Sequence, residues 1–223
     1  MSALVFPIYL SAMVAFAALA VVAPLGLFVA WLQASRPHRW RRLVDAAVML
    51  PMILPPTVIG FFLVFVFGRH GPVGRVLELL GVRVIFTPAA AVIASSVVAF
   101  PVLVKAVQPA MEAVPRELID VGRSLGLGPR AVFFRIVLRS AWRSVITGLV
   151  LAFVRALGEF GATMMFAGMI PGVTNTMPLE IFAAYQRAED ERALLYVAVL
   201  VGVAVLTAML ASRATAARRE SSS

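Results

Sequence analysis

Long apolar runs separated by short polar segments set the pattern of this chain. Five of them have close to, or more than, the roughly 20 residues that a helix needs to cross the hydrocarbon core of a bilayer. They lie near residues 3–32, 44–67, 88–107, 145–170 and 193–211. Because lipid offers the backbone no hydrogen-bond partners, such runs form helices. The pattern predicts an all-α polytopic membrane protein with about five transmembrane helices.

The composition is typical of the same class of protein. Of the 223 residues, 61% are hydrophobic and 14% are charged, whereas soluble domains are about 45–50% apolar. The first run has no basic leader and is too long for a cleavable signal peptide. We therefore expect a single transmembrane domain over residues 1–213, followed by a basic cytoplasmic tail at 214–223. The sequence contains no cysteine, which excludes disulfides and thiolate chemistry.

Basic residues are unevenly shared between the polar segments. Lys105, near the end of the third run, and the segments before the second run, before the fourth run and after the fifth together account for 14 of the 20 lysines and arginines. Positive charge collects on the cytoplasmic side of membrane proteins. We therefore expect a multi-pass protein of the cytoplasmic membrane, with its N-terminus outside and its C-terminus in the cytoplasm. The net charge of +9 then reflects cytoplasmic flanks, and we expect no nucleic-acid partner.

Enzyme motifs are missing from the sequence. It has no HExxH, no GxSxG and no pair of carboxylates within one span. A phosphate-binding P-loop needs the lysine of GxxxxGKS or GxxxxGKT, and the one lysine, Lys105, stands in FPVLVKAVQP. We therefore expect no catalytic residue, no cofactor and no metal. If ATP drives this protein, another chain hydrolyses it.

The cytoplasmic segment 112–139 is unusually polar. Pro115 suits the first position of a helix, and Gly126 favours the left-handed conformation that ends one. Between them, helical spacing places Leu118, Val121, Gly122 and Leu125 in one apolar stripe. We expect a short amphipathic helix across the cytoplasmic ends of the spans, with this stripe beneath it. A helix resting on lipid head groups would show the same pattern.

This segment resembles the EAA motif of ABC importer permeases, in which EAA is followed by three residues, Gly, nine residues and Ile-x-Leu-Pro. Asp120 takes the place of the Glu, Gly122 that of an Ala, and Arg139 that of the Pro. The resemblance implies a coupling helix that seats in an ATPase subunit. The coupling residues on this basis are Asp120, Val121, Gly122, Arg123, Leu125, Gly126, Ile136 and Leu138.

Two further stretches resemble spans of molybdate ABC importer permeases. They are LPMILPPTVIGFFL at 50–63 and RALGEFGATMMFAGMIPG at 155–172. The resemblance implies the type I ABC importer architecture, a homodimer, cytoplasmic ABC ATPase subunits and an external oxyanion-binding protein as partners, and molybdate as cargo. Permeases for sulfate, thiosulfate or tungstate are the nearest alternatives. The residues alone also allow a function of another class, an ion channel or an intramembrane enzyme with an interfacial helix.

Prolines interrupt the second run. Pro51, Pro55 and Pro56 remove backbone hydrogen bonds there, which is tolerated where protein or a water-lined cavity replaces them. Pro55 and Pro56 are therefore candidates for the translocation pathway, and a static kink is the alternative.

The fourth run carries a charged pair and a stripe of small residues. Arg155 and Glu159 stand four residues apart, which puts them on one helix face. One interpretation is a structural ion pair that lowers the cost of burying either charge. The alternative is that Arg155 lines the path of a transported anion. Gly148, Ala152 and Ala156 recur every fourth residue, which suits close helix packing within the chain or at a dimer seam.

Overall fold

The computed structural model describes residues 4–35 and 41–220, and this part of the chain contains helices and no strand. In chain order the helices are α1 (Val5–Ser35), α2 (Arg41–Ile53), α3 (Pro56–Phe67), α4 (Pro72–Leu79), α5 (Pro88–Glu112), α6 (Arg116–Ser124), α7 (Pro129–Val132), the π-helix η1 (Phe133–Val137), α8 (Leu138–Leu157), α9 (Gly161–Phe166), α10 (Met177–Gln186) and α11 (Asp190–Glu220). The predicted all-α membrane fold is confirmed.

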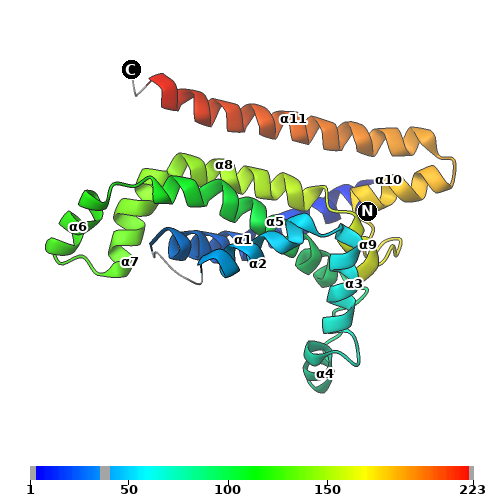
Figure 1. Ribbon diagram of the computed structural model, residues 1–223. Coiled ribbons are helices and arrows are strands. Elements are labelled where there is room, and N and C mark those ends of the chain that lie inside the picture. The colour runs from blue at the N-terminus through cyan, green and yellow to red at the C-terminus, as the bar shows by residue number, and fades with distance from the viewer. Residues whose placement is uncertain (1–3, 36–40, 221–223) are drawn as a thin grey trace.

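The long helices lie side by side in a bundle. Figure 1 shows α1, α5 and α8 packed along one another, with α6 and α7 at one end and α9 and α10 at the other. Among the described residues, four helices are long and apolar enough to cross a membrane: α1, α5, the continuous stretch Pro129–Leu157 and α11 up to Met209. The bent pair of α2 and α3 supplies a fifth if it is counted as one span.

Helix α5 is the centre of the bundle. Leu103, Val104 and Val107 on this helix are fully buried, and glycines on both neighbours let their backbones approach it. A Cβ on Gly26 of α1 would lie 2.8 Å from Leu103 Cδ2, and one on Gly148 of α8 would lie 2.8 Å from Val107 Cγ2. Gly148 of the small-residue stripe therefore packs against α5 of the same chain. This is the first predicted role of the stripe, close packing within the chain, rather than a dimer seam.

The second predicted span is broken. Helices α2 and α3 meet at an angle of 109°, because Pro55 and Pro56 cannot donate the hydrogen bonds that would continue α2. Figure 1 shows α3 leaving the bundle at this corner and carrying α4 away from it. The prediction of a kink is confirmed, and the run over 44–67 forms two helices rather than one continuous helix.

The fourth span lies earlier in the sequence than predicted. Its helix runs from Pro129 to Leu157 rather than over 145–170, and the residues from Gly158 onward leave it. The charges of Arg130, Arg135 and Arg139 placed these residues in the polar segment before the predicted span, but their side chains are exposed on the outer surface of its helix. Long charged side chains can extend from a helix into water or head groups, so they do not stop it.

The last helix is longer than the fifth predicted span. It continues to Glu220, through most of the predicted tail. The predictions that concern residues 1–3, 36–40 and 221–223 lie outside the described residues.

Candidate functional site

The predicted coupling helix is α6, which Figure 1 shows at the end of the bundle beside α7. It begins one residue later than predicted, because Pro115 is its N-cap rather than its first helical residue. At its other end, Gly126 has a φ of +82°. The amide of Leu127 donates to the carbonyl of Gly122 at 3.1 Å, and that of Gly126 donates to Arg123 at 2.9 Å. These two bonds form a Schellman motif, so the predicted helix end at Gly126 is confirmed.

The apolar stripe of α6 faces outward, which corrects the prediction that it lies beneath the helix. Leu118, Val121 and Leu125 are 50%, 58% and 78% exposed. The inner face is made instead by Gly122, which is buried, and by Ile119, which packs against the core. Sequence spacing showed which residues share a face but not which way that face points. The result is a helix with leucine and valine on its outer surface.

The two halves of the EAA-like motif touch each other. A Cβ on Gly122 would lie 2.5 Å from Ile136 Cδ1 and 3.5 Å from Leu127 Cδ1, so glycine lets α6 sit directly on η1. Leu138, at the start of α8, packs against the core. Glycine rather than the alanine of the motif therefore has a packing reason here.

The charged residues of the motif lie on the surface of α6. Asp120 and Arg123 form an ion pair with 3.7 Å between Oδ1 and Nη1, and both side chains are about two-thirds exposed. Solvent-exposed pairs of this kind contribute little to stability. Both charged groups therefore remain accessible on the surface of α6.

A second group of predicted residues lies where α8 ends. Arg155 Nη1 and Glu159 Oε2 are 2.7 Å apart, and their side chains are 35% and 1% exposed. The predicted ion pair is present, although Glu159 stands beyond the last turn of α8. Its other oxygen, Oε1, accepts a hydrogen bond of 2.8 Å from the amide of Ala162. One buried carboxylate thus joins α8 to the first turn of α9.

The corner at Pro55 and Pro56 packs next to this break. A Cβ on Gly161 would lie 2.9 Å from Pro56 Cβ, and one on Gly60 would lie 2.9 Å from the carbonyl oxygen of Ala162. Two interrupted helix pairs therefore meet, α2 with α3 and α8 with α9. Non-helical backbone at membrane depth is tolerated where it is buried in protein or lines a water-filled cavity. The structure brings Pro56, Arg155 and Glu159 into one region through Gly161 and Ala162.

Sequence reasoning missed a buried polar cluster between α10 and α11. The Glu180 carboxylate, 6% exposed, accepts from Arg187 Nη2 at 2.9 Å and lies 3.1 Å from Arg192 Nη2. Asn175 Nδ2 also donates to it. The sequence showed only two external arginines, because no local spacing pairs either of them with Glu180. This cluster fixes the segment that follows α9 against the last helix.

The connection between α10 and α11 also perturbs two exposed groups. The Arg187 guanidinium, which hydrogen-bonds Glu189, lowers the pKa of that carboxyl below its ordinary value. The same bond, with one to Glu180, raises the pKa of Arg187. Both groups stay charged at neutral pH, and the connection is held by charge-assisted hydrogen bonds.

Two ion pairs hold α2 to α5. Arg41 pairs with Glu112, and Lys105 Nζ lies 2.5 Å from Asp45 Oδ1. Val48 is the one buried residue of α2. The contacts of α2 with the bundle are therefore largely polar, although sequence analysis had counted Lys105 and Arg41 only as positive flanks.

Comparison with known proteins identifies the family. Residues 22–220 match the model of the binding-protein-dependent transport system inner membrane component family. The chain belongs to this family. The match covers every helix from the middle of α1 to the end of α11, and therefore both groups of predicted site residues.

Individual members of this transport family with curated names are similar over most of the chain. The molybdenum transport system permease protein ModB of Escherichia coli K12 is 40% identical over 169 residues, 75% of this chain and 74% of its own. The putative molybdenum transport system permease protein YvgM of Bacillus subtilis is 38% identical over 201 residues, 90% of this chain and 88% of its own.

Solved transporters share the fold. An inward-facing MetNI methionine ABC transporter matches with a TM-score of 0.72 at 19% identity, over 96% of this chain and 95% of that one. An amino acid ABC transporter crystallised with histidines matches with a TM-score of 0.61 at 16% identity. The type I ABC importer permease architecture is thus confirmed, and these two matches concern the fold alone.

Proposed function

We propose that this chain is the transmembrane permease subunit of an ATP-driven importer that carries molybdate across the cytoplasmic membrane. The observation that carries the proposal is the similarity to molybdenum transport permeases, at 38–40% identity over three-quarters to nine-tenths of the chain. A permease of this kind moves its cargo and performs no catalysis itself.

A separate ATPase drives transport through α6. The sequence lacks a P-loop, so the work of hydrolysis has to arrive by contact. Leu118, Val121 and Leu125 form an apolar surface on a protruding helix, which a protein partner would cover. Asp120 and Arg123 flank this surface and set the orientation of the partner. The Schellman motif at Gly126 makes the helix end rigid enough to transmit force.

The pathway runs along the region where the two broken helix pairs meet, in a homodimer. Arg155 is partly exposed and carries a positive charge toward which an oxyanion is attracted, while Glu159 holds its guanidinium in place. The carboxylate also weakens the attraction, which suits a carrier that must release its cargo. An external binding protein supplies the selectivity, so the permease needs no tight site.

The orientation follows from the charges. The N-terminus lies outside and the C-terminus in the cytoplasm, because α6 and the exposed arginines of α7, η1 and α8 lie at one end of the bundle. The connection between α10 and α11 then faces outside. So does the segment between α3 and α5.

Transport in vesicles tests the proposal. The permease is reconstituted with its ATPase subunits and a molybdate-loaded external binding protein, and uptake of labelled molybdate is measured with and without ATP. We expect ATP-dependent uptake that requires the binding protein. Competition by tungstate and by sulfate measures selectivity. Uptake of sulfate with none of molybdate would overturn the assignment of the cargo, and ion flux without ATPase or binding protein would indicate a channel.

A further inference from the structure

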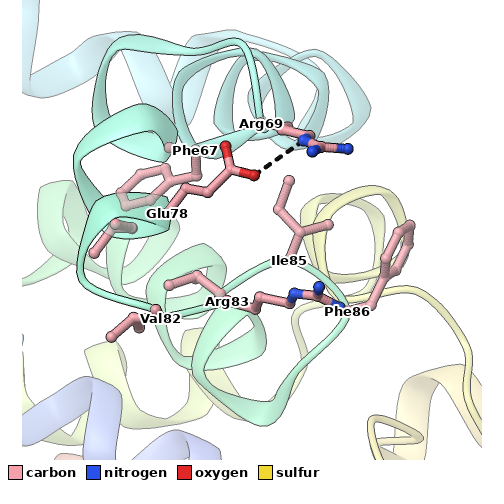
Figure 2. Close-up of a pocket in the computed structure, with 11 residues that line it drawn as sticks. Phe67, Arg69, Glu78, Val82, Arg83, Ile85 and Phe86 are labelled. Carbon is pink, nitrogen blue, oxygen red and sulfur yellow. Dashed lines mark hydrogen bonds and ion pairs between the residues drawn. The ribbon is translucent and has the colours of Figure 1, made fainter.

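The segment between α3 and α5 lines an open cavity of about 730 Å³, which we name the external cavity. Its walls come from the end of α3, from α4 and from the loop at residues 80–87. Figure 2 shows the labelled side chains around it, with Phe67, Ile85 and Phe86 as apolar walls and three charged side chains among them. The charges of Arg69, Arg75, Glu78 and Arg83 keep this segment out of the hydrocarbon core, where each would be costly.

We propose that the external cavity is the docking site for the external oxyanion-binding protein, and that Arg83 receives a carboxylate of that protein. The inference rests on the proposed function. It adds which surface of the permease is recognised, and by what chemistry.

The charge balance of the cavity leaves one guanidinium for a partner. Arg69 Nε donates to Glu78 Oε1 at 3.0 Å, as Figure 2 shows, so these two charges offset each other. Among the described residues Arg83 has no ion-pair partner. The cavity therefore carries a net positive charge, and guanidinium binds carboxylates in a two-bond geometry.

The lining and the rim of the cavity suit protein side chains rather than a free anion. Phe67, Ile85 and Phe86 line it, and a small hydrated dianion gains nothing from apolar walls. Next to the cavity Leu79 and Leu80 are 88% and 70% exposed. An apolar patch with an arginine in it is typical of the centre of a protein–protein interface.

The cavity wall also contacts the intramembrane helix α9. The Phe86 amide donates to the Phe166 carbonyl at 3.3 Å, and a Cβ on Gly168 would lie 2.8 Å from the Phe86 ring. Phe86 has a φ of +61°, an unfavourable conformation for a residue other than glycine. Docking at the cavity would thus press on the helix that Glu159 joins to Arg155. A phospholipid could also bind a cation between apolar walls. A bound lipid would not explain why the cavity wall contacts α9.

Titration of the reconstituted transporter with molybdate-loaded binding protein tests the inference. The ATPase rate is measured for the wild type, for Arg83→Glu and Arg83→Lys, and for Arg75→Glu as a matched control on α4 that does not line the cavity. We expect Arg83→Glu to raise the half-saturating concentration of binding protein about tenfold or more, and Arg83→Lys to raise it less. Arg75→Glu should titrate like the wild type. Leu80→Asp is a second variant, expected to weaken docking independently of Arg83.

The outcomes separate this inference from the proposed function. If the wild type responds to the binding protein but Arg83→Glu and Leu80→Asp respond equally well, the docking site is elsewhere. If the wild type itself shows neither stimulation nor molybdate uptake, the proposed function fails, whatever the variants do. If Arg83→Glu instead lowers the phosphatidylglycerol that copurifies with the permease, while its titration stays like the wild type's, the cavity binds lipid and the inference is overturned.

Discussion

Replacing Gly126 by alanine tests whether the end of α6 has to be a Schellman motif. Gly126 has a φ of +82°, and a Cβ built there meets nothing within 4 Å. The substitution therefore causes no clash within the chain, and its cost is conformational. An L-residue in the left-handed region costs about 1–2 kcal/mol, which is roughly a 5- to 30-fold change in an equilibrium constant.

The matched control is Gly128→Ala, two residues away. Gly128 also has open space around its Cβ position, but its φ is −68°, which alanine adopts without strain. The two variants add the same methyl group to the same loop, and only the backbone conformation differs. Gly126→Asn should fall between them, because asparagine tolerates the left-handed conformation better than alanine does.

Hydrogen exchange over residues 116–127 measures the effect in the purified permease. The Leu127 amide, which donates to Gly122 at 3.1 Å, should exchange about 5 to 30 times faster in Gly126→Ala. In Gly128→Ala it should exchange at the wild-type rate or more slowly. In the reconstituted transporter, stimulation of the ATPase should fall in Gly126→Ala and persist in Gly128→Ala. Equal protection of α6 in the two variants would refute the argument, and normal coupling with a frayed α6 would refute its role in coupling.

Two further predictions concern the intramembrane pair and the topology. Arg155→Ala should lower the free energy of unfolding by about 3–5 kcal/mol, because it leaves the buried Glu159 without its partner. Adding Glu159→Gln should recover much of this loss, since an amide oxygen still accepts from Ala162. A double variant that is less stable than the single one in thermal unfolding would contradict the pairing. The sequence has no cysteine, so single cysteines report on topology. A Leu79→Cys variant should react with an impermeant maleimide in intact cells, and a Leu125→Cys variant should react only after the membrane is opened. The reverse pattern would invert the proposed orientation.

The sequence alone predicted the features that depend on local chemistry. Apolar runs of about 20 residues can satisfy their backbone only as helices in lipid, so the membrane fold was readable. Gly126 ends α6 and the prolines at 55 and 56 break the second span because those residue types act on their own backbone. The contact of Arg155 with Glu159 followed from a spacing of four residues. The charges of α7 and η1, by contrast, wrongly placed these residues before the fourth span, whereas they belong to its helix.

Only the tertiary structure decided how these elements face one another. Helical spacing grouped Leu118, Val121 and Leu125, but the contact of Gly122 with Ile136 turned that group toward solvent. The fit of Gly161 against Pro56 brings the two broken helix pairs together, and the Glu180 cluster joins α10 to α11. These contacts join residues whose side chains have no local reason to meet. They form because the packing of whole helices around α5 decides which helix surfaces meet. That packing depends on the whole chain rather than on any one stretch of it.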